Sequence, residues 1–152
     1  YTNMMCRTYK NILNKKQREK TLKFVKNSVT HLEGYPELQT EPNMHLKDEM
    51  KDFIKATVKY VKPYKISKCW ALCSQGKFIG WHKHLNARYS FVYYLVNPDK
   101  AGTMFLIDEK YGKIEYAKGE ENSLIKFEGY KTHSPPNTHK KTKRYTIVFN
   151  VV

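Results

Sequence analysis

Cysteine is scarce in this chain, and it carries neither a long apolar run nor a secretory signal. Cys6, Cys69 and Cys73 are odd in number and lack the spacing of a zinc ribbon. This pattern predicts free, buried thiols in a reducing, cytoplasmic setting. The longest apolar run, Phe91 to Val96, is far too short to cross a bilayer. We therefore expect no association with a membrane.

Acidic residues are also in short supply. Asp and Glu number 14 against 28 Lys and Arg, which gives a formal net charge of +14. Such an excess favours an anionic partner, nucleic acid included. The alternative is that lysine is simply the default solvated residue, because it is scattered from Lys10 to Lys143 in a chain rich in Asn, Tyr and Ile, whose codons are AT-rich. The tightest basic cluster is 140–144.

Two helical patterns precede a half that is rich in strand-forming residues. Apolar residues at helical spacing predict one helix over 14–32, with Asn14 as N-cap, and a second over about 46–61. From residue 64 onward, short aromatic and β-branched runs alternate with Gly, Pro and Asn, which predicts strands. The expected strands cover 64–74, 77–84, 89–96, 102–107, 112–117, 122–128 and 143–151. We expect one domain of the α+β class over 1–152, with helical support in 1–63 and a sandwich or barrel in 64–152.

Three histidines carry the pattern that most clearly indicates chemistry. His82 and His84 are two residues apart on an expected strand, so their side chains point to the same face, whereas Trp81 would point into the core. His133 arrives from a distant strand end. Three histidines with open coordination positions suit iron or another redox-active divalent metal better than structural zinc.

One arginine on the last strand suggests an anchor for a carboxylate. Arg144 and Thr146 share a face of an otherwise apolar strand, and a buried guanidinium requires a partner. A ligand carboxylate held by two parallel hydrogen bonds is one candidate, with the hydroxyl of Tyr94 beside it. The alternative is an internal ion pair. Its candidate partners are Asp108, Glu115 and Glu128.

Taken in order, these segments resemble the 2-oxoglutarate- and Fe(II)-dependent dioxygenases, most closely the prolyl-4-hydroxylase-like branch and the small oxygenases of this type in bacteria and phages. That family carries a His-x-Asp/Glu metal pair, a tyrosine-rich strand, a distal metal histidine and, about ten residues later, a basic residue that binds 2-oxoglutarate. The matching segments are His82-Lys83-His84, 88–95, His133 and 144–150.

The resemblance implies a fold, a set of cofactors and a reaction. The fold would be a double-stranded β-helix, a cupin-like jelly roll, supported by the two N-terminal helices. His82, His84 and His133 would hold Fe(II), while Arg144, Tyr94 and Thr146 would bind 2-oxoglutarate. With O2 as the oxidant, the enzyme would hydroxylate a substrate and release succinate and CO2. The branch favours peptidyl proline, but a protein, a nucleic acid or a small molecule all remain open as substrate.

One position departs from the family pattern. His84 stands where the family has a metal-binding carboxylate, so either three neutral imidazoles bind the metal or His84 lies behind it while Asn86 or a water completes the site. Two other functions stay open: a three-histidine iron dioxygenase of the cupin type, and a basic jelly-roll protein that binds nucleic acid without catalysis.

Overall fold

Two helices cover one side of the molecule. The computed structural model describes residues 6–76, 79–135, 138–139 and 141–152. Helix α1 (Lys15–Ser28) begins at Asn14, whose side chain accepts a hydrogen bond from the Gln17 amide in a capping box, as the sequence predicts. It ends earlier than predicted, because the chain turns extended at Val29. Helix α2 (Lys51–Val61) follows two short 3₁₀ turns, η1 (Met44–Leu46) and η2 (Asp48–Met50), where the sequence predicts regular helix.

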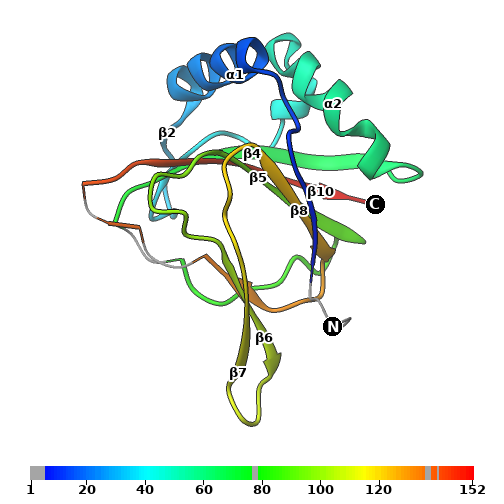
Figure 1. The fold of residues 1–152 in the computed structure, drawn as a ribbon, viewed down its shortest axis with the longest axis vertical. Coiled ribbons are helices and arrows are strands. Elements are labelled where there is room, and N and C mark those ends of the chain that lie inside the picture. Colours follow the sequence, from blue (N-terminus) through cyan, green and yellow to red (C-terminus); the bar gives the residue numbers. More distant parts are fainter. Residues whose placement is uncertain (1–5, 77–78, 136–137, 140) are drawn as a thin grey trace.

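A large antiparallel sheet forms the centre of the fold (Figure 1). Strand β10 is its central strand, paired with β5 on one side and β4 on the other. In spatial order the strands are β1 (Arg7–Tyr9), β8 (Ser123–Glu128), β5 (Tyr89–Val96), β10 (Arg144–Val151), β4 (Ile66–Ser74), β3 (Leu38–Gln39) and β2 (Thr30–His31). The helices lie on one face of this sheet in Figure 1.

A small sheet lies on the other side. Its order is β7 (Lys113–Ala117), β6 (Thr103–Asp108) and β9 (His133–Ser134). The hairpin of β6 and β7 projects from the body of the molecule in Figure 1. Two antiparallel sheets with helices on the outer face of the larger one are the double-stranded β-helix arrangement expected from the sequence.

The alternation of side chains along β10 separates two interiors. Ile147 and Phe149 point toward the helices, where Phe149 stacks on Phe91 at 4.6 Å and meets Phe53 of α2 edge-on at 5.9 Å. The opposite face lines a cavity, described below, beside a smaller cluster that includes Phe105 and Phe127. The predicted helical support is therefore an apolar layer, and the polar side chains gather on the other face of the same sheet.

Two local predictions are wrong. The segment predicted as a strand over 77–84 is not a strand in its described part, 79–84; only His82 forms a bridge there, because its sole β-partner is the two-residue strand β9. Residues 77–78 lie outside the described residues. Trp81 is 40% exposed instead of buried, since no sheet covers this segment. Among the described residues, no helix is long and apolar enough to cross a membrane.

Candidate metal and cosubstrate site

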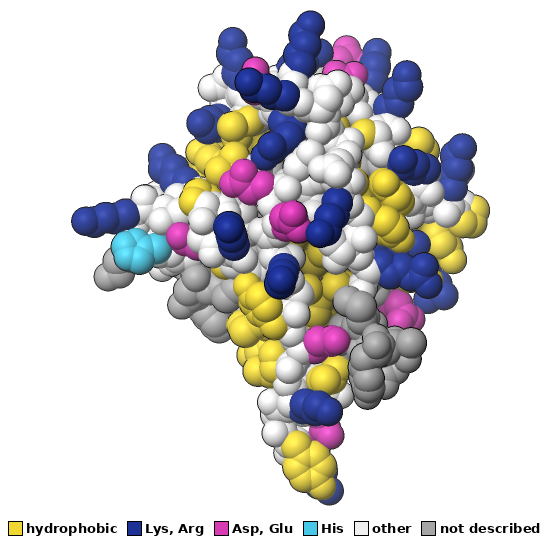
Figure 2. All heavy atoms as spheres, in the orientation of Figure 1, with side chains coloured by type: hydrophobic (Ala, Val, Ile, Leu, Met, Phe, Trp, Pro, Cys, Tyr) yellow, Lys and Arg dark blue, Asp and Glu magenta, His cyan; other side chains and the backbone are white. Residues whose placement is uncertain are grey.

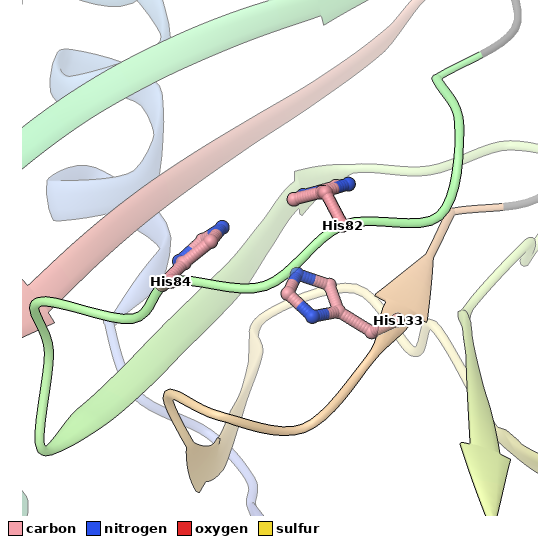
Figure 3. Close-up of side chains that lie close together, drawn as sticks. All are labelled: His82, His84 and His133. Atoms are coloured by element: carbon pink, nitrogen blue, oxygen red, sulfur yellow. The ribbon is translucent and has the colours of Figure 1, made fainter.

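Three histidine rings converge between the sheets (Figure 3). His82 and His133 exchange both backbone hydrogen bonds, at 2.9 and 3.0 Å, and the amide of His84 donates to the Gly129 carbonyl at 2.8 Å. A side chain at position 129 would collide with the carbonyl oxygens of Ala87 and His84, so glycine is required for this close approach. One potential ligand atom from each histidine lies within 4.8 Å of the other two. The structure thus brings together the three histidines that the sequence singles out.

The hydrogen bonds of these rings leave the same nitrogen available on each. Nδ1 of His82 lies 2.8 Å from the Gly80 carbonyl oxygen, and Nδ1 of His133 lies 2.9 Å from that of Lys131. A carbonyl oxygen only accepts, so each Nδ1 must carry the proton. The lone pair of a neutral ring then sits on Nε2, the atom available to a metal.

His84 is oriented by side chains instead of backbone. Its Nδ1 lies 2.9 Å from Oδ1 of Asn150 and 2.8 Å from Oγ of Ser90, and the Ser90 hydroxyl donates to the same Asn150 oxygen at 2.9 Å. This arrangement again places the proton on Nδ1. Sequence analysis missed both orienting residues, although their signal is visible: Ser90 and Asn150 are polar, pair directly across β5 and β10, and lie on the cavity-facing sides of these strands.

Burial keeps two of the rings neutral. It lowers the pKa of His133 to about 3, and the neighbouring rings of His82 and His84 act in the same direction against the Lys131 carbonyl. Burial also lowers the pKa of His84, with the Asn150 hydrogen bond opposing and His82 adding to the effect. Neutral imidazole is the form that binds a metal ion. Both rings are therefore in the form that can bind a metal at neutral pH, without losing a proton.

The histidines line one end of a cavity of about 810 Å³, and Arg144 lines the same cavity. The inner face of the large sheet forms its floor, because Arg144, Thr146, Val148 and Asn150 alternate onto that face. His84 is fixed to Asn150 at one end of β10, and Arg144 lies at the other. Both ends of the candidate site are therefore carried by one strand.

Arg144 is buried without an internal partner for two of its nitrogens. It is 3% exposed, and its Nε and Nη1 have no hydrogen-bond partner among the described residues. The ion pairs found in that part of the chain do not include Arg144, so the alternative of an internal ion pair with Asp108, Glu115 or Glu128 receives no support. Burial lowers the pKa of Arg144, although Tyr94 and Glu37 oppose the shift. The two unpaired nitrogens of this buried guanidinium could therefore bind an anionic ligand in the cavity.

The other two residues assigned to the cosubstrate flank Arg144 in the same cavity. Tyr94 and Thr146 are paired across β5 and β10, and both are almost fully buried. The Tyr94 hydroxyl shares a 2.7 Å hydrogen bond with Oγ1 of Thr103, in which either group can donate. Burial raises the pKa of Tyr94, so its hydroxyl remains protonated at neutral pH. If Thr103 donates in that pair, Tyr94 keeps its own proton for a ligand oxygen.

Comparison with solved structures identifies the fold. The non-heme α-ketoglutarate-dependent epimerase SnoN from nogalamycin biosynthesis aligns over 97% of this chain and 77% of its own, with a TM-score of 0.76 and 10% identity. A prolyl hydroxylase from Trichoplax adhaerens, solved with a fragment of hypoxia-inducible factor, aligns over 98% and 84%, at a TM-score of 0.69 and 16% identity. The viral collagen prolyl hydroxylase of Paramecium bursaria Chlorella virus-1 aligns over 98% and 96%, at 0.66 and 9%.

These neighbours define the class to which the fold belongs. The chain has the double-stranded β-helix fold of the 2-oxoglutarate/Fe(II) oxygenases. The chain matches no protein-family model and no curated protein sequence.

Proposed function

We propose that this protein is an oxygenase that uses Fe(II), 2-oxoglutarate and O2 to hydroxylate a substrate. One observation carries the proposal: three Nε2 atoms with free lone pairs and a buried guanidinium, two of whose nitrogens have no hydrogen-bond partner among the described residues, line the same cavity. Either feature alone would indicate little. Together in one cavity they match the two ends of 2-oxoglutarate, since a metal would bind the keto acid end and the guanidinium would bind the distal carboxylate. The fold supports the same assignment.

The donor set fits the metal. His82, His84 and His133 would hold Fe(II) through Nε2, which leaves coordination positions open for exogenous ligands. When bound there, iron would couple the reduction of O2 to the oxidative decarboxylation of 2-oxoglutarate, which yields succinate and CO2. The protein holds the imidazoles in their metal-binding tautomer through Asn150 and two backbone carbonyls.

The opposite end of the cavity fits the cosubstrate. Arg144 would bind the distal carboxylate of 2-oxoglutarate through its unpaired Nε and Nη1. Thr146 and Tyr94 lie on the same face as hydroxyl donors. Phe127 and Phe105 pack against the His133 ring, at 4.6 and 6.2 Å between ring centroids, and restrict water on that side. These contacts orient the cosubstrate and exclude solvent, which is the protein's share of such chemistry.

The substrate is the least constrained part of the proposal. Peptidyl proline has support from two structural neighbours that are prolyl hydroxylases. Nucleic acid has support from the net charge of +14, although Figure 2 shows Lys and Arg spread over the visible face among acidic residues, without one large patch. A small molecule would fit the cavity volume. The free, buried Cys6, Cys69 and Cys73 support the proposal of a reducing, cytoplasmic location.

The three-histidine set gives a specific reason to keep a second candidate. Three neutral ligands leave a divalent metal one charge more positive than two histidines and a carboxylate would. A three-histidine dioxygenase of the cupin type, which needs no 2-oxoglutarate, would use the same ligands. It would leave Arg144 without a role.

Turnover of the cosubstrate separates the two. The protein purified without oxygen and loaded with Fe(II) should bind 2-oxoglutarate by calorimetry and release succinate when O2 is admitted. His82→Ala and His133→Ala should lose the metal, whereas Arg144→Ala should keep it and lose 2-oxoglutarate. If the metal-loaded protein neither binds 2-oxoglutarate nor forms succinate, the result would favour the cupin-type activity. A protein that binds no Fe(II), Mn(II) or Co(II) would leave only the non-catalytic jelly roll.

A further inference from the structure

One wall of the cavity is acidic in a strongly basic protein. The segment 32–42 contains Glu33, Glu37 and Glu41 but no Lys or Arg, and all three carboxylates line the cavity. Elsewhere the chain has 28 basic residues against its remaining 11 acidic ones (14 less these three). The acidic wall is thus a local reversal of the charge of the whole molecule.

Glu37 is the buried member of this wall. It is 4% exposed, and neither of its carboxylate oxygens has a hydrogen-bond partner of ordinary geometry among the described residues. The register places it in one row with Ser74 and Arg144: Leu38 pairs with Cys73, the residue before Ser74, and Ser74 pairs with Arg144. Glu37 immediately precedes β3, and Arg144 begins β10, with β4 between these two strands. Both residues line the same cavity, but they form no ion pair.

A second anion bound to Arg144 would leave the negative charge of the Glu37 carboxylate without a cation of its own. Burial already raises the pKa of Glu37, and only the nearby Ser74 hydroxyl and the Arg144 guanidinium oppose that shift. If a cosubstrate carboxylate takes Arg144, two anions share one guanidinium. A buried carboxylate in that state requires a new cation or a proton.

The same wall provides the aromatic surface that favours a cation. Tyr35, two residues before Glu37, is 52% exposed and lines the cavity, whereas Trp70 lines it further along β4, where its ring lies 5.8 Å from that of His84. Aromatic faces attract ammonium and guanidinium groups, and more strongly when water is excluded. On this wall a buried carboxylate, two exposed carboxylates and the Tyr35 ring therefore offer a site for a positively charged group.

We propose that the substrate presents a primary ammonium or guanidinium group to Glu37, so that the enzyme acts on basic molecules or on basic side chains of a protein. This inference rests on the proposed function, since it assigns the acidic wall to the substrate that shares the cavity with 2-oxoglutarate. Glu37 is the residue that determines specificity, and the exposed Glu33 and Glu41 add negative potential along the same wall.

Calorimetry with a matched pair of probes tests the inference. Nα-acetyl-L-lysine amide and its neutral analogue Nα-acetyl-L-norleucine amide are titrated into protein loaded with Mn(II), with and without 2-oxoglutarate. With 2-oxoglutarate present, the lysine probe should bind at least about tenfold more tightly than the norleucine probe. Glu37→Gln should abolish that preference. Glu19→Gln removes the same charge from an exposed position on α1 and should leave the preference intact.

The outcomes separate this inference from the proposed function. Equal affinity for the two probes, or a preference that survives Glu37→Gln, would overturn the cation site. In a different outcome, 2-oxoglutarate fails to bind, but the Mn(II)-loaded protein still binds the lysine probe more tightly and Glu37→Gln abolishes that preference. This result would contradict the cosubstrate assignment and support the cation site. Glu37→Gln removes an unpaired buried charge and keeps the side-chain shape, so its thermal unfolding temperature should not fall. That measurement excludes misfolding as the cause of lost binding.

Discussion

Replacing Asn150 by alanine should weaken metal binding without removing a ligand. The Asn150 side-chain oxygen accepts hydrogen bonds from His84 and from Ser90, both at 2.9 Å. Loss of such an orienting partner typically lowers metal affinity about 10- to 100-fold. At about 1.4 kcal/mol per factor of ten, this corresponds to roughly 1.4–2.8 kcal/mol. The direction follows because His84 would lose the acceptor that holds its proton on Nδ1.

The assay is a Co(II) titration in competition with a chelator of known affinity, followed by the absorption of the bound metal. Asn150→Asp keeps an acceptor of similar shape and adds a negative charge, so its affinity should equal or exceed that of the unchanged protein. Asn86→Ala is the matched control, because Asn86 lines the cavity but makes no hydrogen bond to a histidine ring. An Asn150→Ala protein that binds Co(II) within twofold of normal would refute the reasoning. A large loss in Asn86→Ala would revive Asn86 as a ligand.

Three further predictions follow from the fold and the site. Arg144→Met should keep metal affinity and weaken 2-oxoglutarate binding in calorimetry by at least about 10- to 100-fold, because even one charged hydrogen bond is worth about 1.5–3 kcal/mol. Its unfolding temperature should not drop, and unchanged 2-oxoglutarate binding would contradict the anchor role. The metal-free protein should lose stability as the pH falls from about 6.5, the ordinary value for histidine, toward the pKa of about 3 for His133, since the unfolded chain binds a proton that the folded ring does not. Urea denaturation at a series of pH values should show the free energy of unfolding falling by up to about 1.4 kcal/mol per pH unit, and His133→Gln should reduce this slope. The same slope in the variant would contradict the assignment to His133. Phe149→Ala should cost about 3–5 kcal/mol by the same method, because Phe149 is fully buried between Phe91 and Phe53, and a loss below 1 kcal/mol would mean that the helical layer adds little.

Sequence patterns predict best where one physical rule dominates. The strand over 89–96 is observed as Tyr89–Val96, because an unbroken aromatic and β-branched run between two breaks has few alternatives. Alternation along 144–150 correctly places Arg144 and Thr146 on one face. The Asn14 cap is local, so it too could be predicted.

The failures occur where tertiary contacts decide. The segment 79–84 forms no regular strand because only His82 and His84 find backbone hydrogen-bond partners, in β9 and at Gly129. Local propensity does not contain that information. Glu37 was missed for a similar reason: it precedes a two-residue strand, and only the pairing of that strand with β4 buries it in the cavity.

The position of Arg144 and Asn150 on one strand has a consequence for how the site tolerates change. They are six positions apart on the central strand, so their Cα atoms are separated by roughly 20 Å of extended backbone. The covalent repeat of the chain therefore fixes the distance between Arg144, the proposed carboxylate anchor, and Asn150, which orients the His84 ring. Deleting a single amino acid between them would turn the side chain of either Arg144 or Asn150 to the opposite face of the sheet, which packs against the helices. Lengthening the loops outside β10 would leave the distance between the two residues unaltered.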